Sequence, residues 1–185
     1  RPKAVEARFT YARLLALDGK TDSARQEMEK ALKEEPDSPA ILYSLAQLAY
    51  QTKQPAVAER YLRRYIALPE GVQRDNAPAY LFLAQMAEEA KRYDEAIESL
   101  ARIDRGEQFM PALTQRALLM GRIKRVEEAR ELLRTTNVAT NRERVQLTQA
   151  EAQVLRGDAH AAAYRRRNRV SAGRKSGPPR RAGLL

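Results

Sequence analysis

Few residues in this chain could carry out a reaction. There is one histidine, His160, and no cysteine, and a lone histidine without clustered acids or thiolates is a poor metal ligand. Three pairs of adjacent glutamates suggest paired carboxylates: Glu34–Glu35, Glu88–Glu89 and Glu127–Glu128. Adjacent residues of a helix point in different directions, so we interpret these pairs as solvated faces. Without a glycine-rich phosphate loop or an H-E-x-x-H pattern, the sequence predicts no catalytic residue, no metal site and no cofactor.

The composition favours helices. Ala, Leu, Arg, Glu and Gln dominate the 185 residues, and all five are good helix formers. No window of 18 uncharged apolar residues predicts a membrane span. The net charge is +10, but residues 159–185 hold eight of the 34 basic residues and none of the 24 acidic ones. Residues 1–158 therefore carry 26 basic against 24 acidic residues and are nearly neutral.

Alanines recur through the chain in two parallel series. The first series is Ala12, Ala46, Ala84, Ala117 and Ala150. The second series follows twelve residues behind, as Ala24, Ala58, Ala96, Ala129 and Ala162. Two antiparallel helices that cross closely need a small side chain at the crossing, and a larger one would overpack at a cost of about 1–3 kcal/mol. The two series therefore predict a stack of helix pairs.

Apolar residues at helical spacing surround these alanines, as in Ala58–Leu62–Tyr65. Prolines near expected helix starts and a capping box from Thr140 to Glu143 mark the boundaries. The pattern predicts helices at 3–17, 21–34, 39–52, 55–67, 78–91, 94–104, 111–122, 126–135 and 141–156.

The best-formed repeat carries a recognisable set of residues: Tyr11–Ala12, Gly19, Ala24, Met28, Ala31 and Pro36. In this set the chain resembles the tetratricopeptide repeat family, over residues 5 to about 163. The leading Trp of the family pattern is missing, and a longer loop from Pro69 to Asn76 separates the second and third repeats. The resemblance implies an all-α, right-handed superhelical solenoid of antiparallel helix pairs, with about four and a half repeats in a domain of residues 1–163.

The fifth repeat stops matching the pattern partway. Its next two core positions hold Arg166 and Arg169, which cannot be buried unpaired. We therefore expect residues 164–185 to form a basic, disordered tail. One interpretation is an arm that binds nucleic acid or an anionic surface. The favoured interpretation is a tail without a folded role, such as a truncated or out-of-frame end. Separately, the exposed face of the last helix lacks the polar residues that normally cap a solenoid, which would permit self-association there.

In the family, ligands are bound mainly by the first helix of each repeat, on the face away from its partner helix. Transferred by position, the resemblance implies a peptide-binding groove lined by Phe9, Arg13, Tyr43, Gln47, Tyr50, Leu81, Phe82, Gln85, Gln115 and Leu118. The aromatic residues would supply apolar anchors, and Arg13, Gln47 and Gln85 would bond the peptide backbone. The alternative is that Tyr50 and Phe82 simply pack between neighbouring repeats. Some members of the family clamp the terminal carboxylate of a ligand with residues of the first helices. This ligand class is rejected here, because Arg13 is the only residue at the matching positions that could hold a carboxylate.

The function expected from the resemblance is a non-catalytic scaffold that binds a protein or peptide partner in this groove. No small-molecule substrate is expected, and nucleic acid is not favoured. Two alternatives stay open: binding of nucleic acid or an anionic surface through the basic tail, and a targeting region of a larger enzyme such as a glycosyltransferase. The resemblance fits cytoplasmic and bacterial periplasmic or envelope-associated proteins alike.

Overall fold

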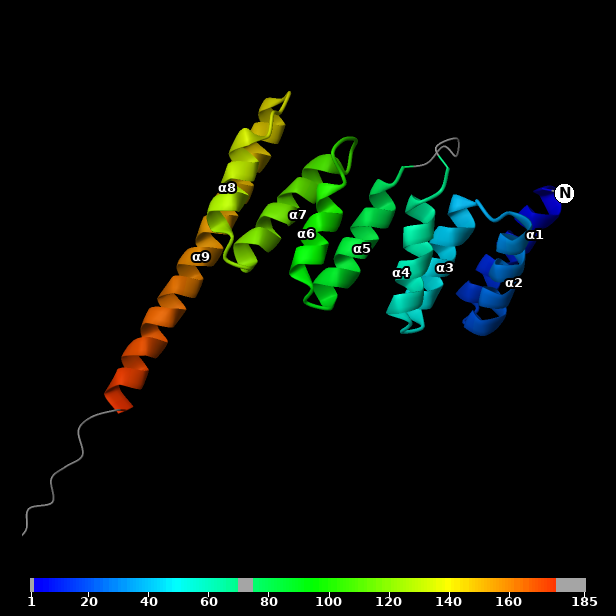
Figure 1. Ribbon diagram of the computed structural model, residues 1–185, viewed down its shortest axis with the longest axis horizontal. Coiled ribbons are helices and arrows are strands. Elements are labelled where there is room, and N and C mark those ends of the chain that lie inside the picture. The colour runs from blue at the N-terminus through cyan, green and yellow to red at the C-terminus, as the bar shows by residue number, and fades with distance from the viewer. Residues whose placement is uncertain (1, 70–74, 176–185) are drawn as a thin grey trace, which may run out of the picture. The chain divides into compact units, whose positions relative to one another are not determined.

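The computed structural model describes residues 2–69 and 75–175, with side chains over residues 4–69 and 75–158. All regular structure in this described part is helical (Figure 1). The helices are α1 (Pro2–Leu17), α2 (Thr21–Glu34), α3 (Pro39–Gln51), α4 (Pro55–Ile66), α5 (Ala77–Glu89), α6 (Tyr93–Ala101), α7 (Phe109–Arg122), α8 (Val126–Thr135) and α9 (Asn141–Lys175). The expected all-α architecture is confirmed, and eight of the nine predicted helices end within about three residues of their observed ends.

The chain divides into two compact units, Arg1–Ala112 and Leu113–Leu185. The first unit contains three helix hairpins, in which α1 packs on α2, α3 on α4 and α5 on α6. Neighbouring hairpins are joined by packing of α2 on α3 and of α4 on α5 (Figure 1). Helices α2 and α4 therefore each contact both their own first helix and the first helix of the next pair, which is the arrangement of a stacked repeat array.

The repeated alanines lie in the interior, as the spacing predicts. Ala12, Ala46 and Ala84 of the first series are fully buried, and so are Ala24, Ala58 and Ala96 of the second. In the second unit Ala117, Ala129 and Ala150 are equally inaccessible. Ala162 lies outside the residues with described side chains. Both alanine series are thus buried within the described helix pairs, as expected for small side chains between packed helices.

Larger aliphatic side chains fill the space around the alanines in the first unit. Ile41, Leu42, Leu45, Leu62 and Leu100 are the largest side chains that are almost fully inaccessible. Over the residues with described side chains, no polar or charged residue is buried. The core is therefore held by apolar burial, which contributes roughly 1.5–3 kcal/mol for each such side chain.

The turn inside each of the first four helix pairs has the same geometry. The second residue after the first helix adopts a positive φ in all four: Gly19 at 75°, Lys53 at 60°, Lys91 at 59° and Lys124 at 68°. The next residue donates its backbone N–H to a carbonyl five positions earlier, as in the bond of 2.9 Å from Gln54 to Ala49. This hydrogen bond satisfies a carbonyl group at the helix end that would otherwise lack a donor. Three of the four turns have an exposed lysine in a conformation that favours glycine, so the preference of the side chain at this position does not dictate the turn.

In the second unit α9 packs against α8 and approaches α7 closely. A Cβ added to Gly121 of α7 would lie 3.1 Å from Val154 Cγ1, so glycine permits that approach. The Glu151 carboxylate accepts bonds from Arg130 at 3.1 Å and Arg134 at 2.8 Å, which connects α8 to α9. These pairs lie at the surface and add little beside the apolar contacts of Leu133.

Helix α9 corrects one sequence-based expectation. We predicted a helix at 141–156, but α9 continues through Gly157 to Lys175. Residues 164–175, assigned to the irregular tail, are therefore helical, and residues 176–185 lie outside the described residues. The physical reason is local: Ala159 and 161–163 are strong helix formers, and one glycine costs only about 1 kcal/mol in a helix. The division at residue 163 and a role for the tail stay predictions.

The predicted capping box opens α9. Glu143 Oε2 accepts the Thr140 backbone N–H at 2.9 Å, and the Glu143 N–H donates to Thr140 Oγ1 at 3.2 Å. Hydrogen bonds with Thr140 lower the pKa of Glu143. The bond from the Thr140 backbone N–H contributes most, and the bond with the Thr140 side chain comes second. A carboxyl group whose pKa is lower in the folded state stabilises that state above its unfolded pKa. The stabilisation is lost as the pH falls through the folded pKa.

Replacing Thr140 by alanine is expected to speed amide hydrogen exchange in the first turn of α9 about fivefold at neutral pH. The difference from the unaltered chain should shrink as acid protonates Glu143. Thr148→Ala is the matched control, because the Thr148 hydroxyl bonds a carbonyl within the helix at 3.0 Å and caps nothing. Equal exchange in both variants would show that the box does not hold this helix end.

Candidate functional site

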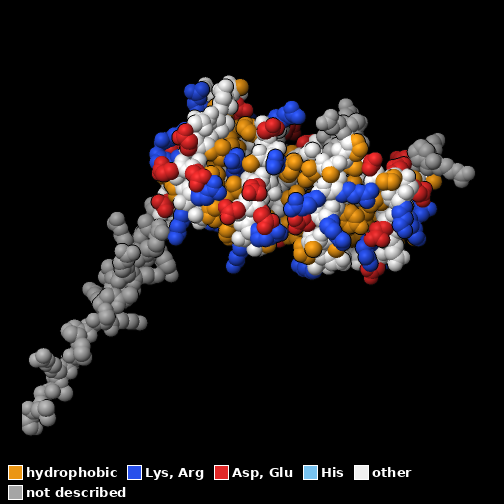
Figure 2. Space-filling view, in the orientation of Figure 1, with side chains coloured by type: hydrophobic (Ala, Val, Ile, Leu, Met, Phe, Trp, Pro, Cys, Tyr) orange, Lys and Arg blue, Asp and Glu red, His pale blue; other side chains and the backbone are white. Residues whose placement is uncertain are grey.

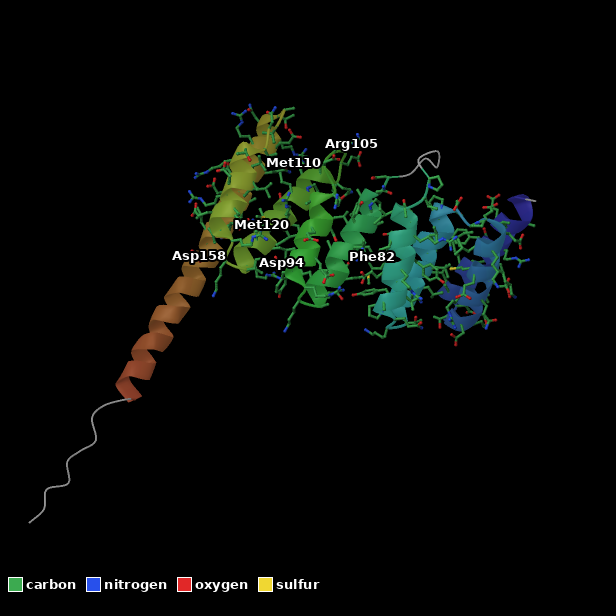
Figure 3. The ribbon with its side chains drawn as sticks, in the orientation of Figure 1. Phe82, Asp94, Arg105, Met110, Met120 and Asp158 are labelled. Atoms are coloured by element: carbon green, nitrogen blue, oxygen red, sulfur yellow. The ribbon has the colours of Figure 1, made fainter. Side chains whose placement is uncertain are left out.

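Three of the predicted groove residues form one aromatic patch in the first unit. Tyr43 and Tyr50 come from α3 and Phe82 from α5. Phe82 lies edge-on to both tyrosines, with ring centroids 5.3 Å from Tyr50 and 6.1 Å from Tyr43. Figure 3 marks Phe82 on α5. We call Tyr43, Tyr50 and Phe82 the aromatic patch; it joins the first helices of two consecutive repeats.

The three rings are half-buried rather than buried. They pack against the core of the first unit, and Tyr43 also contacts Tyr65 of α4 at 6.1 Å between ring centroids. Burial raises the pKa of the Tyr43 hydroxyl. The rings thus pack between neighbouring repeats while remaining partly accessible to solvent, and peptide binding by them stays a prediction.

A hydrogen-bonded carboxylate borders the aromatic patch. The Tyr50 hydroxyl donates to Glu89 Oε2, and Gln85 Nε2 donates to Glu89 Oε1 at 3.0 Å. The bond from Tyr50, and after it the bond from Gln85, lowers the pKa of Glu89. Glu89 was assigned only to a solvated face from the sequence, because its partner Tyr50 is 39 residues away.

The other predicted groove residues are divided between the two units. In the first unit, Phe9 and Leu81 are half-buried, whereas Arg13 and Gln47 are exposed. Phe9 packs against the same core as the aromatic patch. Gln115 and Leu118 belong to the second unit, where both are half-buried. The structure thus brings together Tyr43, Tyr50, Phe82 and Gln85, and the groove as a whole stays a prediction.

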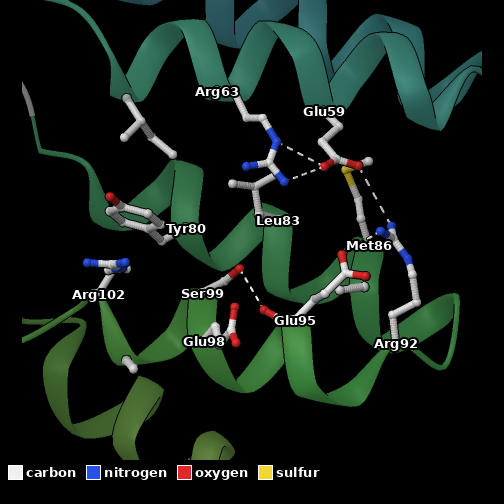
Figure 4. Close-up of a pocket in the computed structure, with 13 residues that line it drawn as sticks. Glu59, Arg63, Tyr80, Leu83, Met86, Arg92, Glu95, Glu98, Ser99 and Arg102 are labelled. Atoms are coloured by element: carbon white, nitrogen blue, oxygen red, sulfur yellow. Dashed lines mark hydrogen bonds and ion pairs between the residues drawn. The ribbon is translucent and has the colours of Figure 1, made fainter.

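A cavity that sequence reasoning missed lies beside α5. It has a volume of about 750 Å³ and lies between α4, α5 and α6 (Figure 4). We call it the inter-repeat cavity. Its apolar lining comes from Ile66, Leu83, Met86, Ala87 and Ala101. Leu83 and Ala87 stand on the side of α5 away from Phe82 and Gln85, as the helical period requires.

Charged residues surround the inter-repeat cavity and are mostly paired. Glu59 of α4 accepts a bond from Arg63 at 2.6 Å and lies 3.8 Å from Arg92 (Figure 4). Arg92 also contacts Glu95 at 2.5 Å. In the described part of the chain, the guanidinium of Arg102, next to Tyr80 in Figure 4, has neither an ion pair nor a hydrogen bond.

Two family models of tetratricopeptide repeats match this chain, one over residues 15–69 and the other over residues 43–108. Together they cover just over half of the 185 residues, including the aromatic patch and the inter-repeat cavity. The chain belongs to the tetratricopeptide repeat family. The resemblance drawn from the alanine series is thereby confirmed, and no curated protein sequence matches the chain.

Solved structures share this tetratricopeptide repeat fold. The crystal structure of MamA is 15% identical, with a TM-score of 0.63 over 100% of both chains. YrrB, described as a TPR protein with an unusual peptide-binding site, is 15% identical, with a TM-score of 0.59 over 89% of this chain and 83% of its own. PilF of Pseudomonas aeruginosa is 18% identical, with a TM-score of 0.57 over 90% of this chain and 74% of its own. Family and fold together support a protein-interaction scaffold.

The surface of this tetratricopeptide repeat protein shows no large patch of one charge in the view of Figure 2, where acidic and basic side chains alternate over the described residues. Within those residues, no helix is long and apolar enough to cross a membrane. Nor do three or more histidine, cysteine or acidic side chains gather in a metal-binding arrangement there.

Proposed function

We propose that the first unit binds a peptide segment of a partner protein on the surface formed by its first helices, α1, α3 and α5. The observation that carries this proposal is the aromatic patch. Three rings from consecutive repeats lie within contact distance and remain half-exposed. Aromatic side chains with one open face are the residues that most often dominate binding energy in protein interfaces.

Polar groups around the patch suit a peptide backbone. Gln47 is exposed one turn after Tyr43, and Gln85 is exposed one turn after Leu81. Amide side chains can donate to and accept from an extended chain without selecting its side chains. Gln85 is held by Glu89, so its oxygen is oriented for a ligand N–H. Arg13 adds an exposed cation from α1.

Replacing both Tyr43 and Phe82 by alanine is expected to weaken peptide binding at least about tenfold, because two anchoring rings are removed. The probes are peptides enriched from a displayed random library on the full chain, and binding is measured by calorimetry. Tyr11→Ala is the matched control, since Tyr11 of α1 is 55% exposed and lies outside the aromatic patch. Circular dichroism checks that each variant keeps its helices.

Two results would contradict the proposal. One is a library selection that enriches no peptide; the other is undiminished binding by the double variant. If the double variant loses helicity and the Tyr11→Ala control does not, the rings belong to the core. The binding measurement is then repeated with Tyr43→Leu and Phe82→Leu, which retain the bulk of the side chains.

A further inference from the structure

The two inter-hairpin spaces of the first unit occupy equivalent places in the repeat. The smaller space, about 340 Å³, lies between α2 and α4 and is lined by Glu29, Leu32, Tyr61 and Arg64, among others. Counting along the alanine series, 34 residues separate α2 from α4 and 38 separate α4 from α6. Glu29 and Leu32 thus correspond to Arg63 and Ile66, and Arg64 corresponds to Arg102, all of which line the inter-repeat cavity.

The two spaces differ in one residue of the second helix that lines each of them. Tyr61 stands three residues after Ala58, and the residue three after Ala96 is Ser99. Tyr61 is half-buried in its space, where burial and then the nearby Glu29 raise the pKa of its hydroxyl. Ser99 has no ring, and its hydroxyl donates to the Glu95 carbonyl at 2.9 Å. The inter-repeat cavity therefore lacks the aromatic side chain that lines the equivalent, smaller space.

The cation at the end of this cavity is also unpartnered. Arg64 donates to the Pro36 carbonyl at 2.7 Å, but its counterpart Arg102 has no such bond in the described chain. Arg63 and Arg92 are neutralised by Glu59 and Glu95. Glu98 lies on the same helix face one turn before Arg102, so a ligand carboxylate would approach Arg102 from the side of Tyr80, away from Glu98.

We propose that the inter-repeat cavity binds an aromatic side chain from an acidic segment of a partner protein, with a carboxylate next to the ring held by Arg102. The apolar lining of Leu83, Met86 and Ala87 accepts the ring, as the equivalent space accepts Tyr61. The volume lies within the roughly 300–1,000 Å³ of ordinary ligand sites. None of the three rings of the aromatic patch lines this cavity, so the proposal does not depend on peptide binding at the patch.

The proposal is tested with N-acetyl-L-phenylalanine, which combines the ring and the carboxylate. Binding is followed by NMR of methionine methyl groups in the full chain, since Met86 lines the cavity and Met28 is buried in α2. We expect the Met86 signal to shift with a Kd on the order of a millimolar, while the Met28 signal stays in place. The amide derivative should bind at least threefold more weakly, and N-acetyl-L-alanine at least tenfold more weakly. No Met86 shift, or equal shifts with the alanine derivative, would overturn the proposal.

Variants separate the roles of Ser99 and Arg102. S99Y places a ring in the cavity and is expected to abolish the Met86 shift, whereas S99A leaves the space open and should retain it. R102Q should remove the preference for the acid over the amide. The Tyr43→Ala, Phe82→Ala double variant should bind the probe normally. A Met86 shift that persists in S99Y would overturn the proposed site. If S99Y fails to fold, R102Q remains as the test: an unchanged preference for the acid over the amide would overturn the role of Arg102.

Discussion

Replacing Leu62 by alanine is expected to lower the free energy of unfolding by about 2–5 kcal/mol. Leu62 of α4 is completely inaccessible and stands one turn after Ala58 in the stripe that packs on α3. The substitution removes apolar contacts and leaves a cavity that tightly packed neighbours fill only in part. The measurement is urea unfolding followed by far-ultraviolet circular dichroism, with a constant denaturant slope showing that the same surface is exposed.

Leu14→Ala is the matched control for this prediction. It makes the same chemical change at a position of α1 that is 59% exposed. Its effect should stay within about 0.5 kcal/mol. Equal losses in the two variants would mean that solvent exposure does not decide the contribution of a leucine here. The described hairpin packing of α3 on α4 would then be wrong.

The second large effect is expected from Ala58→Leu, which should lower the free energy of unfolding by about 1–3 kcal/mol. Ala58 is fully buried, and its helix packs on α3, which carries the equally buried Ala46. A leucine there must either force the helices apart or adopt a strained rotamer. The loss is measured by the same urea unfolding.

Ala56→Leu in the same helix provides the comparison. Ala56 is exposed in the first turn of α4, so added bulk extends into solvent and should change stability by no more than about 0.5 kcal/mol. A neutral Ala58→Leu would show that the helices of a pair can separate without cost. That result would remove the physical reason for the spacing of alanines throughout the chain.

Helix positions were predictable from the sequence because they depend on local features. The predicted bounds of the second and eighth helices match α2 and α8 to the residue. Alanine spacing, proline at helix starts and the Thr140 capping box all act within one or two turns. The predicted end of the last helix at residue 156 was wrong, because α9 continues through Gly157. A helix passes through a single glycine when strong helix formers follow it.

The candidate sites depended on longer-range contacts. The sequence assigned Tyr43 and Phe82 to one surface, but the contact between their rings depends on the angle at which α5 stacks beyond α3. The bond from Tyr50 to Glu89 joins residues from different repeats, and no local pattern indicates it. The inter-repeat cavity did leave a signal, namely serine at position 99 where the preceding repeat has Tyr61.

The sequence by itself determined the repeat, its helix pairs and the buried alanines, because a helix crossing needs a small side chain whatever lies farther away. The tertiary structure decided which side chains of different repeats meet: the rings of the aromatic patch, the carboxylate of Glu89 and the space beside Ser99. These contacts depend on the offset between stacked hairpins. That offset results from the packed volumes of many side chains distant in sequence, rather than from any one period along the chain.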